Sequence, residues 1–215
     1  MIAMSSAKTG PKIEYYFTAI SPFAYLGHAV FMEMVQRLDL DVTYRPVQLG
    51  KIFGESGGVP VPQRHPARIR NRMLELLRWK DHRGLEMNVQ PKFFPTNPVL
   101  ADCTIIALQQ EGKDPSALIG KLLRKVWAEE ADIAERSVIA ACLSECGEDA
   151  DAILATAESG AVAAIYEANT QRGLELDIIG APCVVYQGEA FWGQDKFGFV
   201  EEAITSCRPA YTGAV

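Results

Sequence analysis

The chain has 215 residues, 48% apolar and 22% charged, which is ordinary for a soluble globular protein. Its formal net charge of −6 argues against a general nucleic-acid-binding protein, and no apolar run reaches the roughly 18 residues of a membrane span. We therefore expect neither nucleic acid nor a membrane as a partner. Residues 1–12 lack the apolar core of an export signal, which predicts a disordered N-terminal tail on a cytoplasmic protein.

The five cysteines argue against a disulfide framework, because their number is odd and their spacing irregular. Cys142 and Cys146 stand four residues apart, but no second ligand pair lies nearby, so no metal site is expected. No C-x-x-C sequence occurs anywhere in the chain. Reduced thiols of this kind fit a cytoplasmic location.

The beginning of the chain predicts a β-α-β unit. Apolar and aromatic residues from Ile13 onward are typical of a buried strand. Ser21 and Pro22 then fit the N-cap and the first position of a helix that extends to about residue 38. A short second strand ends near Pro46, so the two strands should be parallel with a right-handed crossover.

The middle of the chain predicts loops and helices. Residues 50–66 are rich in glycine and proline, which favours a loop. The helix expected over residues 66–84 has a basic face that we interpret as solvated. Three prolines between residues 90 and 98 exclude regular structure there. Further helices are predicted at residues 99–110, 115–130, 135–146, 149–158 and 161–173.

The end of the chain predicts two strands, residues 183–186 and 189–192, joined by a tight turn and followed by a last helix. The whole order is that of an α/β fold, a small β-α-β…β-β-α sheet with a large all-helical insertion. Its expected parts are a sheet domain from residues 13–49 and 178–207, an inserted loop and helical domain from residues 50–177, and a C-terminal tail from residues 208–215.

Ser21 is the first candidate for chemistry. It would lie where a strand turns into a helix, so free backbone N–H groups and the positive end of the helix dipole would converge beside it. An anion, or a thiol that must become one, is stabilised at such a point. The simpler interpretation is an ordinary helix cap without chemistry.

Three motifs make a specific resemblance: S-P-F-A-Y-L at residues 21–26, G-A-P at residues 180–182 and F-W-G-Q-D-K at residues 191–196. Together they resemble the 2-hydroxychromene-2-carboxylate isomerase family, a DsbA-like group related to kappa-class glutathione transferases. The resemblance covers about residues 13–207. It implies the thioredoxin fold with a helical insertion and a cis-proline at Pro182.

The resemblance also implies glutathione as the cofactor and Ser21 as the catalytic residue, whose hydroxyl would hydrogen-bond the sulfur of glutathione. Disulfide oxidoreductases of this fold carry C-x-x-C where this chain has Ser21 to Ala24, so dithiol exchange is lost. The implied glutathione contacts are Ser21, Ala181, Pro182, Trp192, Gly193, Gln194 and Asp195. The candidate substrate contacts are Lys51, Arg64, Phe94 and Asn97.

The function implied by the resemblance is cis–trans isomerisation of 2-hydroxychromene-2-carboxylate, or a related aromatic substrate, to trans-o-hydroxybenzylidenepyruvate. The family works in aromatic hydrocarbon catabolism such as naphthalene degradation, and its members lead us to expect a homodimer. Two alternatives stay open: a kappa-type glutathione transferase or peroxidase that consumes glutathione, and a glutathione-binding protein without turnover.

Overall fold

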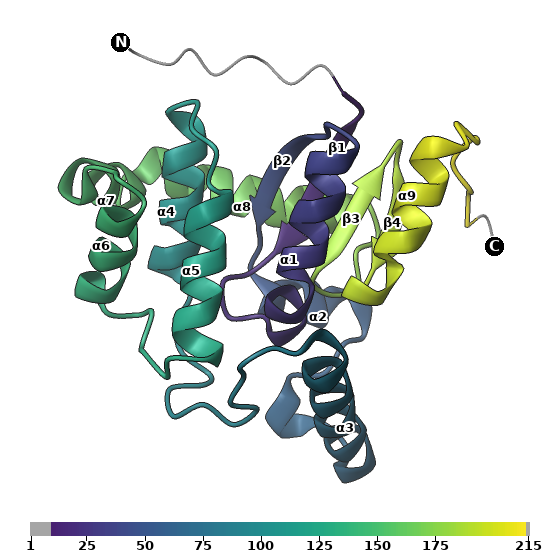
Figure 1. Cartoon of the computed structure of the whole chain (residues 1–215), viewed down its shortest axis with the longest axis horizontal. Helices are drawn as coiled ribbons and strands as arrows, with labels where there is room; N and C mark the ends of the chain where they lie inside the picture. The colour runs from purple at the N-terminus through teal and green to yellow at the C-terminus, as the bar shows by residue number, and fades with distance from the viewer. Residues whose placement is uncertain (1–9, 214–215) are drawn as a thin grey trace.

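The computed structural model describes residues 10–213 and places a four-stranded sheet among helices (Figure 1). The strands are β1 (Lys12–Phe17), β2 (Asp41–Pro46), β3 (Cys183–Tyr186) and β4 (Glu189–Trp192). Their order across the sheet is β2-β1-β3-β4; β1 and β2 are parallel, and the other two pairs are antiparallel. The predicted β-α-β…β-β-α sheet is confirmed.

The helices lie where the sequence predicts them, with one exception. Helix α1 (Pro22–Arg37) connects β1 to β2, and α9 (Phe197–Thr205) follows β4. The insertion contains α2 (Leu49–Ser56), α3 (Pro66–Arg83), α4 (Val99–Gln110), α5 (Ser116–Trp127), α6 (Arg136–Glu145), α7 (Ala150–Ala157) and α8 (Gly160–Glu175). Residues 90–98, with their three prolines, form no helix or strand, as expected.

The exception is the loop predicted for residues 50–66, which is wrong over its first part because α2 forms there. Leu49, Ile52 and Phe53 recur at helical spacing, and Ile52 is completely buried. Gly57 then ends α2 in the left-handed conformation, with φ of 73°. The burial of one apolar face therefore outweighs the low helix propensity of the glycines in this segment.

The two faces of the sheet pack against different helices. Successive side chains of a strand point to opposite faces, so Tyr15 faces α1, where its ring stacks on Phe31 with centroids 4.1 Å apart. Tyr16 faces the other way and packs with Val47 and with Ile52 of α2. In Figure 1, α1 and α9 accordingly lie in front of the sheet and α8 crosses behind it.

The sheet and most of the inserted helices share one hydrophobic core. Buried side chains form a continuous cluster from Tyr15 in β1 through Ile105 of α4 to Leu122 and Trp127 of α5. The inserted segment is therefore packed onto the sheet. The boundaries at residues 13–49, 50–177 and 178–207 stay a prediction.

The predicted tails fall mostly at the edges of the described range. Residues 1–9 and 214–215 lie outside it, and Lys12, assigned to the tail, already belongs to β1. At the C-terminal end, Arg208 pairs with Glu189 of β4 at 2.7 Å. The visible part of the C-terminal tail is therefore attached to the edge of the sheet.

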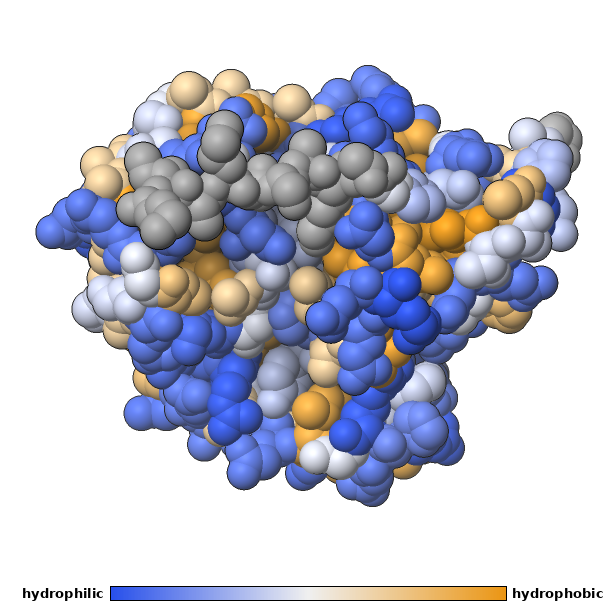
Figure 2. All heavy atoms as spheres, turned by 45° about the horizontal axis from the view of Figure 1, so that its top comes forward, coloured by the Kyte–Doolittle hydropathy of each residue, from blue (hydrophilic) through white to orange (hydrophobic). Residues whose placement is uncertain are grey.

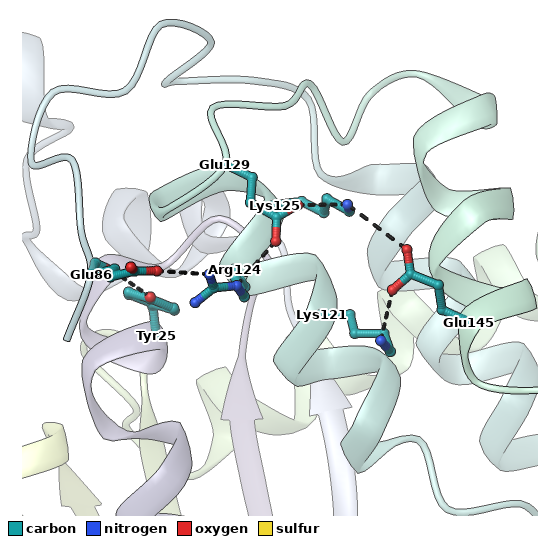
Figure 3. A network of polar contacts seen from close by, with 7 residues as sticks. All are labelled: Tyr25, Glu86, Lys121, Arg124, Lys125, Glu129 and Glu145. Atoms are coloured by element: carbon teal, nitrogen blue, oxygen red, sulfur yellow. Dashed lines mark hydrogen bonds and ion pairs between the residues drawn. The ribbon is translucent and has the colours of Figure 1, made fainter.

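A surface network links α1 to α5 and α6 (Figure 3). The hydroxyl of Tyr25, in the first turns of α1, donates to the backbone carbonyl of Glu86 at 2.6 Å, and the Glu86 carboxylate pairs with Arg124 of α5 at 2.8 Å. Further pairs join Arg124 and Lys125 to Glu129, and Lys121 and Lys125 to Glu145. Exposed ion pairs contribute little individually, so the largely buried Tyr25 is the firmest link in this network.

Hydrophilic residues predominate on the face of the molecule shown in Figure 2, with apolar atoms gathered in patches between them. From residue 10 to residue 213, no helix combines the length and the hydropathy that crossing a bilayer requires.

A buried carboxyl group anchors the loop between β1 and α1. Asp102 of α4 accepts hydrogen bonds from Thr18 Oγ1 at 2.9 Å, from the Ala19 N–H at 2.8 Å and from the hydroxyl of Tyr166 in α8 at 2.8 Å. Burial raises the pKa of Asp102 to about 7, although the three hydrogen bonds act in the opposite direction. Asp102 thereby connects two inserted helices to the loop that leads into Ser21.

Asp102 should make stability depend on pH. Its carboxyl titrates near 4 in an unfolded chain, so between about pH 4 and 7 the folded state binds more protons and this group lowers stability as the pH rises. From pH 4 to 7, we expect the free energy of unfolding of the wild type to fall by on the order of 2–4 kcal/mol more than that of Asp102→Asn. Urea denaturation at each pH measures this. Asp151→Asn, at an exposed position, is the control, and identical pH slopes for the wild type and Asp102→Asn would contradict the prediction.

Candidate functional site

A cavity of about 440 Å³ lies where the N-terminus of α1 meets the segments before β3 and after β4. It brings together six of the seven residues predicted to contact glutathione: Ser21, Ala181, Trp192, Gly193, Gln194 and Asp195. The seventh, Pro182, is buried beside the cavity, and its carbonyl accepts the Gly193 N–H at 2.9 Å. The bond between Ala181 and Pro182 is cis, as the resemblance implies.

Ser21 caps α1 and is 4% exposed. Its Oγ accepts the Ala24 N–H at 3.2 Å, as an N-cap side chain should. The same hydroxyl donates to the Ala181 carbonyl over 3.4 Å, a long contact. The hydroxyl proton is therefore held only weakly by the protein and is free to turn toward a ligand in the cavity.

One backbone donor beside Ser21 is also free. Pro22 has no N–H, and the Ala24 N–H is taken by the Ser21 hydroxyl. The Phe23 N–H has no acceptor among the residues that the structure describes. It lies in the first turn of a 16-residue helix, where the helix dipole favours negative charge. The site thus offers a hydroxyl and an N–H to an anion.

The wall opposite α1 is an open piece of backbone. A Cβ at Gly180 would come within 2.5 Å of Trp192 Nε1, so the indole lies directly against the glycine backbone. The N–H of the next residue, Ala181, has no acceptor within residues 10–213. Trp192 itself is 51% exposed. This wall has an unpaired backbone donor and an aromatic side chain facing the same space.

The turn after β4 requires glycine at position 193. Gly193 has φ of 108°, and a Cβ there would come within 2.4 Å of Asp195 Oδ1. The Asp195 carboxylate can therefore fold back over the turn, where it pairs with Lys196. The neighbouring Gln194 is buried, and its side-chain oxygen accepts a hydrogen bond from Arg83 at the end of α3.

The four predicted substrate residues do not lie together. Arg64 and Phe94 line the cavity, whereas Lys51 and Asn97 do not. Lys51 is exposed on α2 and pairs with Glu167 of the neighbouring α8 at 2.6 Å. Asn97 accepts the Val99 N–H at 3.1 Å, two residues on, and so forms a local turn just before α4.

Helices α2 and α3 supply cavity residues that the sequence analysis missed. Arg72, Glu75 and Trp79 line the cavity from α3, and Leu49 and Phe53 line it from α2. The basic face of α3 was expected to be solvated, which is wrong for the half-buried Arg72. The spacing of three and then four residues from Arg72 to Glu75 and Trp79 marks one helix face, and this mixture of charge and aromatic surface was the available signal.

Among the described residues, no cysteine lines the cavity. Burial raises the pKa of Cys183 to about 12 and those of Cys103 and Cys142 to about 11, which disfavours their thiolates. Within residues 10–213, no three His, Cys, Asp or Glu side chains are grouped so as to hold a metal ion. A sulfur nucleophile at Ser21 would therefore have to come from a ligand.

The chain is similar in sequence to isomerases and to a glutathione transferase over most of its length. It is 28% identical to the 2-hydroxychromene-2-carboxylate isomerase of Sphingobium xenophagum, a match that covers 88% of this chain and 95% of the relative. It is 24% identical to glutathione S-transferase kappa 1 of Caenorhabditis elegans, a match that covers 93% of both chains.

A solved structure and a family model also match this chain over most of its length. The solved structure of a 2-hydroxychromene-2-carboxylate isomerase superposes with a TM-score of 0.79 at 22% identity, covering 91% of this chain and 95% of the other. The family model described as the DSBA-like thioredoxin domain matches residues 12–205, nearly the whole chain. The chain therefore belongs to the DSBA-like thioredoxin domain family.

Proposed function

We propose that this protein is a glutathione-dependent isomerase that converts 2-hydroxychromene-2-carboxylate, or a related aromatic substrate, to trans-o-hydroxybenzylidenepyruvate. The observation that carries the proposal is a pair of donors at the start of α1, the weakly held Ser21 hydroxyl and the unpaired Phe23 N–H. Ser21 and Phe23 both line a cavity whose described lining contains no thiol. Relatives named as isomerases of this type support the choice of reaction.

These donors fit a bound thiolate. A free thiol has a pKa of about 8.5, so only a few per cent of it is ionised at neutral pH. Hydrogen bonds to the charged form and the N-terminus of a helix both lower that pKa. Ser21 and Phe23 provide these two effects, since both offer a hydrogen-bond donor at the N-terminus of α1. Pro22 between them has no N–H of its own.

The remaining walls fit the rest of the tripeptide. The open N–H of Ala181 suits the backbone of an extended peptide, which pairs with it like an added strand. Asp195 supplies a carboxylate for the ammonium group of the γ-glutamyl end. Gly193 keeps the turn clear of a Cβ, so that this carboxylate has room.

When bound, glutathione supplies a thiolate that adds reversibly to the unsaturated carbon, so that a double bond becomes a rotatable single bond before elimination. The role of Ser21 would be to hold the sulfur in place through its hydroxyl. Phe23, Phe53 and Phe94 line the same cavity, and their rings exclude water and offer apolar surface to an aromatic ring.

A kappa-type glutathione transferase is the second candidate, favoured by the similarity to glutathione S-transferase kappa 1. It would use the same Ser21 donor but consume glutathione. A homodimer and a cytoplasmic location, both implied by the resemblance or the sequence, stay predictions.

Ser21→Ala should disable the site without unfolding the protein. Hydrogen bonds to charged groups are worth about 1.5–3 kcal/mol, so the pKa of bound glutathione should rise by about 1–2 units and the isomerase rate should fall about 10- to 100-fold. Ultraviolet titration of the bound thiolate and a rate assay measure the two effects.

Ser159→Ala is the matched control for this variant. Ser159 caps α8 by accepting the Val162 N–H at 3.3 Å and does not line the cavity, so its loss removes a cap alone. Both variants should lose about 1 kcal/mol of stability. Only Ser21→Ala should change the thiol pKa. An unchanged thiol pKa and an unchanged isomerase rate in Ser21→Ala would show that Ser21 is only a helix cap and would contradict its proposed role.

The stoichiometry of glutathione separates the two enzymes. We expect a panel of hydroxychromene carboxylates to be converted only when glutathione is present, with the free thiol concentration unchanged at the end. Absorbance of the product and titration of remaining thiol give both quantities from one sample. Loss of one glutathione per turnover would assign the transferase, and a rate indifferent to glutathione would reject both enzymes.

A further inference from the structure

The outer face of α3 is not covered by the described part of the chain. Leu76 is the only buried residue among the 18 of this helix, which lies at the lower edge of the molecule in Figure 1. Leu74 is 48% exposed and Leu77 is 40% exposed. These two side chains stand three residues apart and are therefore neighbours on the helix surface. Together they form an apolar surface that another helix can cover.

The exposed positions around these leucines follow a heptad repeat, which we call the outer stripe. Steps of alternately three and four residues connect its six exposed members: Ala67, Arg70, Leu74, Leu77, Asp81 and, directly after the helix, Gly84. This spacing keeps the members on one side of a helix, as at the a and d positions of a coiled coil. None of the six lines the cavity. The outer stripe is therefore a surface separate from the candidate site.

Two unpaired charges of opposite sign flank the leucines. Arg70 lies four residues before Leu74, and Asp81 lies four residues after Leu77. The only ion pair that α3 makes within residues 10–213 joins other side chains of the helix, so Arg70 and Asp81 have no partner there. The outer stripe thus has an apolar centre, a cation towards one end and an anion towards the other.

The outer stripe is complementary to itself when two copies run antiparallel. If a two-fold axis passes between positions 75 and 76, Leu74 lies opposite the second copy's Leu77, and Arg70 lies opposite the second copy's Asp81. The same register sets Ala67 against Gly84, so that small residues meet at both ends. Layers that combine an a position with a d position are what an antiparallel pair of heptad stripes forms.

The two charges exclude the parallel arrangement. In a parallel pair each residue meets its own copy, so Arg70 would face an arginine and Asp81 an aspartate, and like charges in contact destabilise an interface. The antiparallel pair brings opposite charges together, and its two-fold symmetry makes each contact occur twice. Charge complementarity therefore favours one register and one direction.

We propose that α3 forms the interface of a homodimer, in which the outer stripes of two copies pack antiparallel through Leu74 and Leu77 and pair Arg70 with Asp81. A second copy fits this surface because the stripe supplies both members of every contact. The other side of α3 carries Arg72 and Trp79, which line the cavity. The dimer therefore supports one wall of the candidate site from outside.

Sedimentation equilibrium over the micromolar concentration range tests the proposal. A helix of 18 residues is about 27 Å long, so the interface is at the small end of specific interfaces and we expect micromolar dissociation. Leu74→Asp and Leu77→Asp should each raise the dissociation constant about 100-fold or more, because each variant places a charge against leucine on both sides of the axis. Both positions are exposed, so the fold should be retained.

Charge reversal tests the register. Arg70→Glu and Asp81→Arg should each raise the dissociation constant about tenfold, because like charges then meet twice across the axis. The double variant exchanges the members of each pair and should return the constant to within about threefold of the wild type. Arg68→Glu is the matched control and should change nothing, since Arg68 is an exposed arginine of α3 outside the outer stripe.

Hydrogen exchange gives a second measurement. The amides of residues 66–83 should exchange more slowly in the wild type than in Leu74→Asp at the same concentration, and circular dichroism verifies the fold of each variant. A wild type that is monomeric at every concentration, a dimer that survives Leu74→Asp, or a double reversal that does not recover the dimer would overturn the proposal. Neither glutathione nor substrate is present in these measurements, so their outcome is separate from that of the proposed function.

Discussion

The Ser21 hydroxyl joins two segments that are 160 residues apart in the chain, since it caps α1 and also reaches the Ala181 carbonyl. Much of the surrounding structure fixes the two sides of this contact. Asp102 holds the loop before Ser21 through the Ala19 N–H. Next to Ala181, the Trp192 indole lies against the backbone of Gly180. This contact is long and therefore weak, so a ligand atom can replace the Ala181 carbonyl as the acceptor of the Ser21 hydrogen bond.

The two parts of the chain contribute different chemistry to the cavity. The sheet and its adjoining turns supply backbone donors and the Asp195 carboxylate, which suit a peptide-like ligand. Helices α2 and α3 of the insertion supply aromatic rings and unpaired guanidinium groups, which suit an aromatic acid. The resemblance implies a reactive cysteine at this position in disulfide oxidoreductases of the fold, where this chain has Ser21, and the proposed function assigns the helix terminus to a ligand's sulfur.

Local patterns predicted the features that local interactions determine. The Ser21-Pro22 helix start, the strands and the tight turn between β3 and β4 follow from cap, propensity and backbone rules that act over a few residues. The sequence did not predict the positions of residues that depend on packing between segments far apart in the chain. Lys51 points away because α2 winds into a helix to bury Ile52, and Arg72 enters the cavity because α3 packs near Phe94. Asp102 looked like an ordinary first-turn acid of α4 until the fold placed Thr18 and Ala19 beside it.

A crystal structure of the protein with bound glutathione tests the central claim most directly, because it locates the sulfur. The account predicts the sulfur within hydrogen-bonding distance of both Ser21 Oγ and the Phe23 N–H, with the tripeptide backbone paired to Ala181. A sulfur placed elsewhere in the cavity, with the Ser21 hydroxyl still directed at the Ala181 carbonyl, would contradict it.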